Sequence, residues 1–221
     1  AAEDKRFYEH DGADEAAIAR AAISNAAAGE TVSGASTITQ QLVKNLILDS
    51  RQTMSRKAQE ITLARQLEKR MTKDEILSMY LNRVYFGSGL YGIDAASRYY
   101  FGKPPEKMTI AEAALLAALP KAPSKLNLRE NLEGAKDRQQ YVLREMRSMK
   151  FISKQEEAAA LEAEINIIAP PVYDAELGYV LDVATEKLAA ILPRVPGDAV
   201  VTLTIDPKLQ SRVEKRVSER L

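Results

Sequence analysis

Four helix-start signals constrain the fold of this chain more than any other feature of its sequence. Each has the form Ser/Thr-x-x-Glu/Gln, in which the first side chain caps a helix and the fourth reaches back to the capping residue. They lie at Thr37–Gln40, Thr72–Glu75, Thr109–Glu112 and Ser153–Glu156, each just before a helix-forming run. The sequence therefore predicts a mainly α fold, built from helices packed on one another.

Further helices follow from the residues that stop them. An Ala-rich helix is expected from about Asp14 to Gly29, another from Ser55 to about Arg70, a third over Ile110–Leu119, and two charged ones between Asn131 and about Ile168. The glycine-rich stretch Tyr85–Gly92 is predicted to be an irregular loop. Residues from about Asn82 to Gly92 are either part of a mobile, membrane-facing region or packed tightly on the core.

A proline pair at Ala169-Pro170-Pro171 marks a domain boundary. Residues 1–168 are predicted to form one domain and residues 169–221 a short strand–helix linker. In the linker we expect a helix over about Asp174–Leu192, a strand over Ala199–Ile205 and a last helix after Asp206-Pro207. One strand cannot form a sheet, so the linker is expected to lead to a domain outside this sequence.

Composition excludes several classes of protein. Lys and Arg total 31, as do Asp and Glu, which argues against a chain-wide polybasic surface and so against a nucleic-acid partner. Cys is absent and His10 is the single histidine, which excludes disulfide scaffolds and any site that needs two histidines. No window reaches the roughly 18 apolar residues of a membrane-spanning helix.

Three clusters could carry chemistry. The first, residues 3–12, crowds carboxylates around His10, although a solvated turn would have the same composition. The second, residues 34–45, leads small residues into a helix start, which favours an anion. There Ser36, Gln40 and Lys44 share one helix face that has no carboxylate, which suits a phosphate or sugar. An amphipathic surface helix is the alternative.

The third cluster places an acid in an apolar stripe. Glu60 falls among Leu63, Ala64, Leu67 and Met71, and the cations of Arg56 and Lys57 lie one turn earlier. A structural ion pair and a tuned reactive carboxylate both fit this pattern. Two separated carboxylates and three cations near a helix start are the groups needed for sugar chemistry on a diphosphate-activated substrate.

The three clusters resemble the first three motifs of the peptidoglycan glycosyltransferases (family 51 type), the polymerase domains of class A penicillin-binding proteins and of monofunctional transglycosylases. The matching residues are Glu3-Asp4-x-x-Phe7-x-x-His10-x-Gly12, Gly34-Ala35-Ser36-Thr37-Ile38-Thr39-Gln40-Gln41-Leu42-x-Lys44-Asn45 and Arg56-Lys57-x-x-Glu60. Two further motifs follow over residues 73–92 and 95–103, and Leu119–Pro123 is similar to the closing signature. The pair Gly-Ala, where other members have Gly-Gly before Ser36, favours a 1A-like member of the family.

The resemblance implies a lysozyme-like helical domain with a small membrane-facing jaw. It implies an enzyme that polymerises lipid II into β-1,4 glycan strands with inversion and release of undecaprenyl diphosphate. Expected partners are lipid II, the growing strand, the cytoplasmic membrane and other cell-wall synthesis proteins, and moenomycin is the expected inhibitor. The expected location is the periplasmic face of the inner membrane, with an anchor preceding Ala1. No cofactor is required by the sequence, although a divalent cation, Mg²⁺ or Mn²⁺, could join the diphosphate.

The resemblance also assigns roles to residues. Glu3 matches the general base and Glu60 the second essential carboxylate. The substrate and diphosphate contacts are expected from Ser36, Gln40, Lys44, Arg56 and Lys57. Residues expected to support the motifs are Asp4, Phe7, His10, Gly12, Thr37, Gln41, Asn45, Asn82, Tyr85 and Gly87.

Two departures from the family pattern matter. Gln52 stands where many relatives have an arginine, which leaves the role of Arg51 open. Neither Ser-x-x-Lys nor Lys-Thr-Gly occurs, so a transpeptidase active site is absent from these residues. A lysozyme-like hydrolase is the alternative enzyme, but its leaving group does not need the Lys44, Arg56 and Lys57 cations. A catalytically silent scaffold is a further alternative, which intact Glu3 and Glu60 disfavour.

Overall fold

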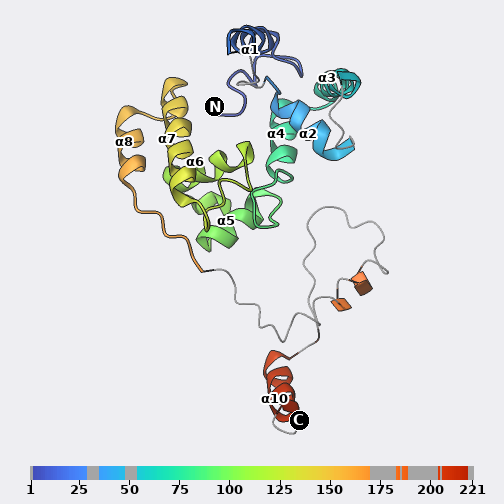
Figure 1. Ribbon diagram of the computed structural model, residues 1–221, viewed down its shortest axis with the longest axis vertical. Coiled ribbons are helices and arrows are strands. Elements are labelled where there is room, and N and C mark those ends of the chain that lie inside the picture. The colour runs from blue at the N-terminus through green and yellow to red at the C-terminus, as the bar shows by residue number, and fades with distance from the viewer. Residues whose placement is uncertain are drawn as a thin grey trace. The chain divides into compact units, whose positions relative to one another are not determined.

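The computed structural model describes residues 2–28, 35–47, 54–169 and 206–218, with residues 183–184, 186–188 and 204. The chain divides into two compact units, Ala1–Ile168 and Ala169–Leu221. The first unit is mostly helical (Figure 1), so the mainly α prediction is confirmed. Its helices are α1 Glu15–Ala28, α2 Ile38–Ile47, α3 Met54–Glu68, α4 Lys73–Leu81, α5 Ile93–Phe101, α6 Ile110–Ala118, α7 Leu132–Ser148 and α8 Lys154–Glu162.

Three of the four predicted capping boxes are present. Thr72, Thr109 and Ser153 each accept a hydrogen bond from the backbone N–H three residues on, and the glutamates at those positions return the contact. The box at Thr37 is wrong in its second half. Thr37 Oγ1 accepts from the Gln40 backbone, but the Gln40 side chain turns instead to the Gly12 carbonyl.

Helix α6 contributes buried residues to both apolar clusters of the first unit, Leu115 and Leu116 to one and Ala114 to the other, and most of its surface is accordingly apolar. It packs against α7 and α8, where Ala114, Val142, Leu143 and Ala160 are buried. A larger apolar cluster joins Phe7, Ile38, Leu42, Ile76, Tyr80, Phe86, Tyr100, Leu115, Leu116 and Leu119. This cluster connects the first motif and α2 to α4 and α5.

The two charged helices end sooner than the sequence predicts. Helix α8 stops at Glu162, and residues 163–169 are not helical. Ile168 donates its N–H to the Tyr100 carbonyl at 2.9 Å, and its own carbonyl accepts from Arg129 at 2.9 Å. Contacts with α5 and Arg129 therefore replace further helical turns.

The glycine-rich loop fits the packed alternative over its first half. Val84 and Phe86 are buried, and the Phe86 N–H donates to the Leu90 carbonyl at 2.9 Å. Gly87 adopts φ +84°, and a Cβ there would lie 2.8 Å from the Pro123 carbonyl oxygen. Tyr91, by contrast, is 61% exposed.

The second unit is described mainly at α10, Pro207–Ser218, which is the predicted last helix. Asp206 starts it, accepting from the Leu209 N–H at 3.3 Å. Most of the predicted helix Asp174–Leu192 and the predicted strand Ala199–Ile205 lie outside the described residues, and the role of residues 169–221 stays a prediction. Among the described helices, none combines the length and apolar character needed to cross a bilayer.

Candidate functional site

A residue of the first motif, far from helix α2 in the sequence, caps the start of that helix. Asp4 is buried, and its Oδ2 accepts from the Ile38 N–H at 3.1 Å and contacts His10 Nε2 at 2.9 Å. The Ile38 N–H is one of the four that a helix start leaves without an intrahelical partner. Asp4 therefore caps α2 and places its neighbour Glu3 beside the same helix.

Gly12 closes the first motif against α3. It adopts φ +81°, and a Cβ there would lie 2.7 Å from backbone atoms of Ala64 and Arg65. Its carbonyl accepts from Thr37 Oγ1 at 2.9 Å and from Gln40 Nε2 at 3.0 Å. Glycine is needed because both the positive φ and the close approach exclude a side chain.

Glu3, the predicted base, is held by two side chains from different helices. Gln41 Nε2 of α2 donates to its Oε2 at 3.3 Å, and Arg138 Nη2 of α7 lies 3.7 Å from its Oε1. Tyr80 of α4 donates its hydroxyl to Gln41 Oε1 at 3.2 Å. Burial, and then the charge of Glu3, raise the pKa of Tyr80 well above its usual range, so the phenol remains a donor.

Glu3 lies between two pockets of different character. A pocket of about 340 Å³ is lined by polar residues including Lys5, Arg20 and Ser36. A second, of about 330 Å³, is mostly apolar and is lined by residues of α4, α6 and α7, among them Leu77 and Met146. Glu3 therefore borders both pockets.

The second and third motifs meet at the Lys57 ammonium. Its Nζ donates to Ser36 Oγ at 2.9 Å, to Gln40 Oε1 at 2.8 Å and to Glu60 Oε2 at 3.0 Å. An ammonium has three donors, so these acceptors use all of them. The structure thus brings together four of the predicted residues.

Glu60 is buried, as its place in the apolar stripe predicts. Its side chain is 4% exposed, and Arg56 Nη2 lies 3.3 Å from Oε1 while Lys57 holds Oε2. Both predicted cations therefore flank this carboxylate. The negative charge keeps two cations aligned at the start of α3.

Lys44 and Asn45 are exposed on α2, with Lys44 one turn after Gln40. Gln40 itself is 1% exposed, so it lies inside the protein and not on an open polar face. Gly34, Arg51 and Gln52 lie outside the described residues.

The remaining support residues divide into two places. Phe7 is buried beside Tyr8 and His10. The others, Asn82, Tyr85 and Gly87, lie in the fourth motif. Asn82 ends α4, and the Tyr85 ring lies against that of Tyr91, with centroids 4.9 Å apart and planes tilted by 36°. This second group shapes the loop after α4.

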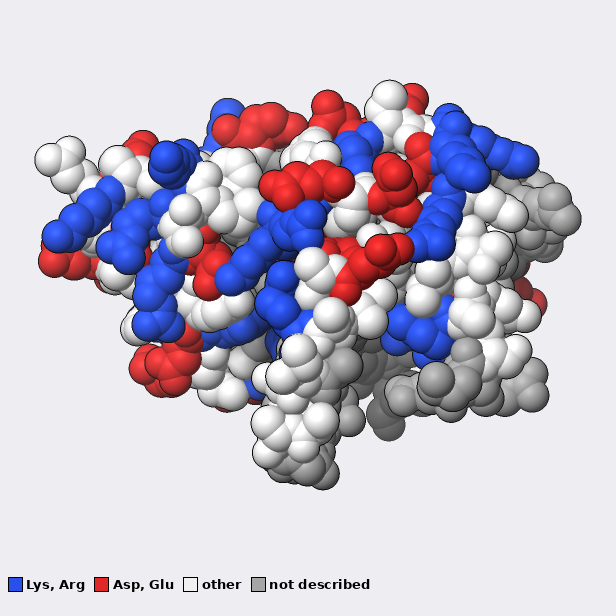
Figure 2. All heavy atoms as spheres, turned by 90° about the horizontal axis from the view of Figure 1, so that it is seen from above, with Lys and Arg blue, Asp and Glu red and all other residues white. Residues whose placement is uncertain are grey.

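Charges of both signs interleave on the face shown in Figure 2, where blue and red side chains alternate. That face has no continuous basic surface of the kind that binds nucleic acid.

The residues around Glu60 do not fit a divalent cation well. Both of its oxygens already face the cations of Arg56 and Lys57, and Mg²⁺ or Mn²⁺ requires oxygen ligands free of competing positive charge. Over the described ranges, no group of three or more His, Asp or Glu side chains is arranged to hold a metal. A metal at the diphosphate stays a prediction.

Two contacts of the site have no signal in the sequence: the approach of Arg138 to Glu3 and the hydrogen bond of Tyr80 to Gln41. Arg138 is 135 positions from Glu3 and sits in a charged helix where nothing in the local pattern distinguishes it. Its guanidinium also stacks on Tyr141, with 4.3 Å to the ring centroid. Only the packing of α7 against the first motif reveals it.

Comparisons with known proteins agree with the motifs. Residues 1–147 match the family model described as Transglycosylase. Penicillin-binding protein 1A of Neisseria gonorrhoeae is 48% identical over 166 residues, which cover 75% of this chain and 21% of that protein. Penicillin-binding protein 1F of Bacillus subtilis is 38% identical over 225 residues, which cover 99% of this chain and 32% of that protein.

Among solved structures, penicillin-binding protein 1A of Haemophilus influenzae is 30% identical, with a TM-score of 0.47 over 71% of this chain and 20% of that one. The chain spans about a fifth of the Neisseria protein's length and about a third of the Bacillus one. Because the family model covers most of the chain, the chain belongs to the transglycosylase family, the glycosyltransferase domain of class A penicillin-binding proteins.

Proposed function

We propose that this chain polymerises lipid II, joining the GlcNAc 4-hydroxyl of one molecule to the MurNAc C1 of another with inversion and release of undecaprenyl diphosphate. One observation carries the proposal. Consecutive residues of α2, Gln40 and Gln41, contact the Lys57 ammonium on one side and the Glu3 carboxylate on the other. A base and an anion-binding cluster thus share one helix turn.

Glu3 would act as the general base. Its carboxylate takes the proton of the acceptor hydroxyl as the oxygen forms its bond to C1 of the donor. The donation from Gln41 Nε2 and the nearby Arg138 guanidinium orient that carboxylate. The two pockets beside Glu3 would receive the two sugars.

The cations would serve the leaving group. As the C1–O bond breaks, its electron pair moves to the diphosphate oxygen, where cationic donors stabilise the developing charge. The Lys57 side chain is 36% exposed, so its ammonium can exchange the Ser36 hydroxyl for a phosphate oxygen. Arg56 and exposed Lys44 would add charge along the same path.

Glu60 would hold these cations and would not touch the reacting sugar. Its buried carboxylate keeps Arg56 and Lys57 aligned before the substrate arrives. Preorganised charge costs no reorganisation during the reaction. This assigns the second essential carboxylate a positioning role.

The wider setting follows the family resemblance. We propose that the protein acts at the periplasmic face of the inner membrane, with the growing glycan strand and cell-wall synthesis proteins as partners and moenomycin as an inhibitor.

The test is polymerisation of labelled lipid II by the wild type and by Glu3→Gln. We expect the variant to lose at least about 10²-fold in turnover, the usual contribution of a general base, while it still binds lipid II. The control Glu9→Gln changes an exposed carboxylate paired with Arg6 and should polymerise normally. Retention of a tenth of wild-type turnover by Glu3→Gln, or cleavage of glycan without polymer, contradicts the proposal.

A further inference from the structure

Behind Glu3, five polar side chains from four parts of the chain form one network. They are Asp4, His10, Thr39, Glu68 and Lys73. The side chains of Asp4, His10 and Glu68 are 3–5% exposed and that of Lys73 is 20% exposed. A buried network of this kind either is fully satisfied or destabilises the protein, so its contacts fix the geometry.

The contacts of His10 select one tautomer. Its Nε2 lies 2.9 Å from Asp4 Oδ2, and a carboxylate only accepts, so Nε2 carries the proton. Its Nδ1 lies 3.4 Å from the Lys73 ammonium, which only donates, so Nδ1 is the acceptor. Through these two contacts the imidazole links Lys73 to the residue that caps α2.

Lys73 and Glu68 hold His10 through further hydrogen bonds. Lys73 Nζ donates to the His10 carbonyl at 2.5 Å and to Glu68 Oε2 at 2.7 Å. Glu68 Oε1 accepts from the Thr39 hydroxyl at 2.5 Å, and Thr39 is fully buried in α2. The network thus returns to the helix that Asp4 caps.

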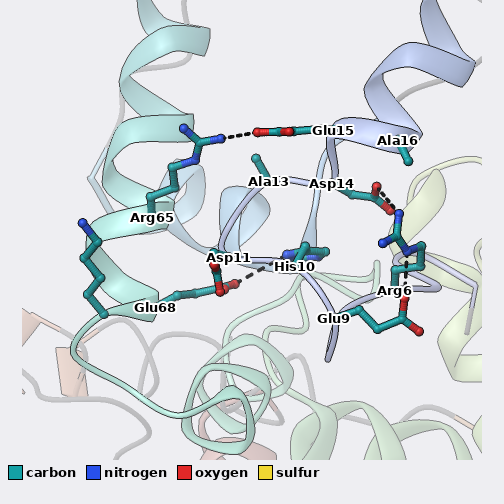
Figure 3. Close-up of a pocket in the computed structure, with 11 residues that line it drawn as sticks. Arg6, Glu9, His10, Asp11, Ala13, Asp14, Glu15, Ala16, Arg65 and Glu68 are labelled. Carbon is teal, nitrogen blue, oxygen red and sulfur yellow. Dashed lines mark hydrogen bonds and ion pairs between the residues drawn. The ribbon is translucent and has the colours of Figure 1, made fainter.

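Figure 3 shows the outer side of this network, with His10 and Glu68 joined across a pocket of about 680 Å³. In the same pocket Arg65 pairs with Glu15 at 2.8 Å, and both side chains are exposed. That peripheral pair offers a matched control for substitutions in the network.

We propose that Thr39, Glu68 and Lys73 are positioning residues that hold His10 as its Nε2–H tautomer, and through Asp4 fix Glu3 against the start of α2. This inference rests on the proposed function. The three residues touch neither sugar nor diphosphate. They act by setting where the base stands relative to the Lys57 cluster.

The single histidine makes the network directly observable. In the full chain labelled with ¹⁵N, the imidazole signals should report one Nε2–H tautomer. In Lys73→Met, His10 Nδ1 loses its donor, so the imidazole signals should shift and the Ile38 amide should exchange faster. Thr39→Val should do the same to a smaller degree, whereas Thr39→Ser, which keeps the hydroxyl, and Glu15→Gln should match the wild type.

Kinetics test the link to catalysis. Both Lys73→Met and Thr39→Val should lower kcat by about 10- to 100-fold, as small misplacements of reacting groups do, with KM within about twofold. Thr39→Ser and Glu15→Gln should keep wild-type kcat. Altered imidazole signals with normal kcat overturn the positioning role, and unchanged signals in both variants overturn the network itself.

Two other outcomes are separable. If Lys73→Met fails to fold, the comparison of Thr39→Val, which replaces the hydroxyl by a methyl group, with Thr39→Ser, which keeps the hydroxyl and loses the methyl group, decides the question. If the wild type does not polymerise lipid II, the proposed function is wrong. The imidazole signals and the exchange rate of the Ile38 amide still show whether the network holds His10 and the start of α2.

Discussion

Replacing Glu60 by glutamine should lower the free energy of unfolding by an amount that depends on how far its partner Lys57 is buried. Breaking a buried ion pair by removing one partner costs about 3–5 kcal/mol because the other charge stays buried. An exposed pair contributes about 0–1 kcal/mol. The Glu60 side chain is 4% exposed but that of Lys57 is 36% exposed, so the pair lies between these limits.

We therefore expect Glu60→Gln to lower the free energy of unfolding by about 2 kcal/mol, well below the fully buried case. For a protein of this size that corresponds to a fall in Tm of about 4–8 °C. Lys57→Met in the Glu60→Gln background should cost less than Lys57→Met in the wild type, because the ammonium then has no carboxylate to lose. The coupling between the two sites should reach about 1 kcal/mol.

Urea unfolding of the wild type, both single variants and the double variant measures each quantity in the full chain. The control pair is Glu15→Gln with Arg65→Met, where both side chains are exposed and the coupling should be small. Additive effects of Glu60→Gln and Lys57→Met, or a Glu60→Gln variant as stable as the wild type, would refute the reasoning. The ion pair would then be incidental to both stability and alignment.

Three further predictions follow from single contacts. Gly12→Ala should lower the free energy of unfolding by more than about 2 kcal/mol, because it adds a close contact to a strained backbone. Gly89→Ala has φ +76° but nothing within 4 Å of the added Cβ, so it should lose only the roughly 1–2 kcal/mol of the strained backbone. Equal losses in urea unfolding would contradict this. Tyr80→Phe should reduce lipid II turnover by about fivefold, the value of one hydrogen bond, without changing Tm by much; unchanged turnover would count against the Gln41 contact. Burial raises the pKa of Glu112, but hydrogen bonds from Lys103 and Thr109 outweigh it and hold that pKa below 4.5. The stabilising contribution of the Glu112 carboxylate is thus present at neutral pH and lost as pH falls below 4.5. Glu112→Gln should therefore lose less Tm than the wild type between pH 5 and pH 3. Parallel curves of Tm against pH for the variant and the wild type would exclude Glu112 as a cause of the acid destabilisation.

Local signals predicted most of the helices because a capping box is an interaction between residues three apart. Thr72, Thr109 and Ser153 begin helices as expected, and the last helix begins after Asp206. Thr37 shows the limit of that reasoning. The Gln40 side chain finds the Gly12 carbonyl, 28 positions away, and Asp4 takes over part of the cap.

The prediction of where α8 ends was wrong for a related reason. Residues 163–169 have no strong stop signal, and their backbone groups find partners in Tyr100 and Arg129. Helical propensity differs by less than about 1 kcal/mol between most residues, so one or two tertiary hydrogen bonds decide such an end.

The sequence by itself determined which residue types gather near the start of α2, and the motif order was sufficient to identify the family. It also predicted that Glu60 is buried and flanked by two cations, since both follow from the spacing of residues on one helix. The tertiary structure alone decided that Lys57 joins Ser36 and Gln40, that Arg138 approaches Glu3, and that Lys73 and Glu68 enclose His10. These contacts join segments far apart in the chain, and their geometry depends on how helices pack, which no local pattern encodes.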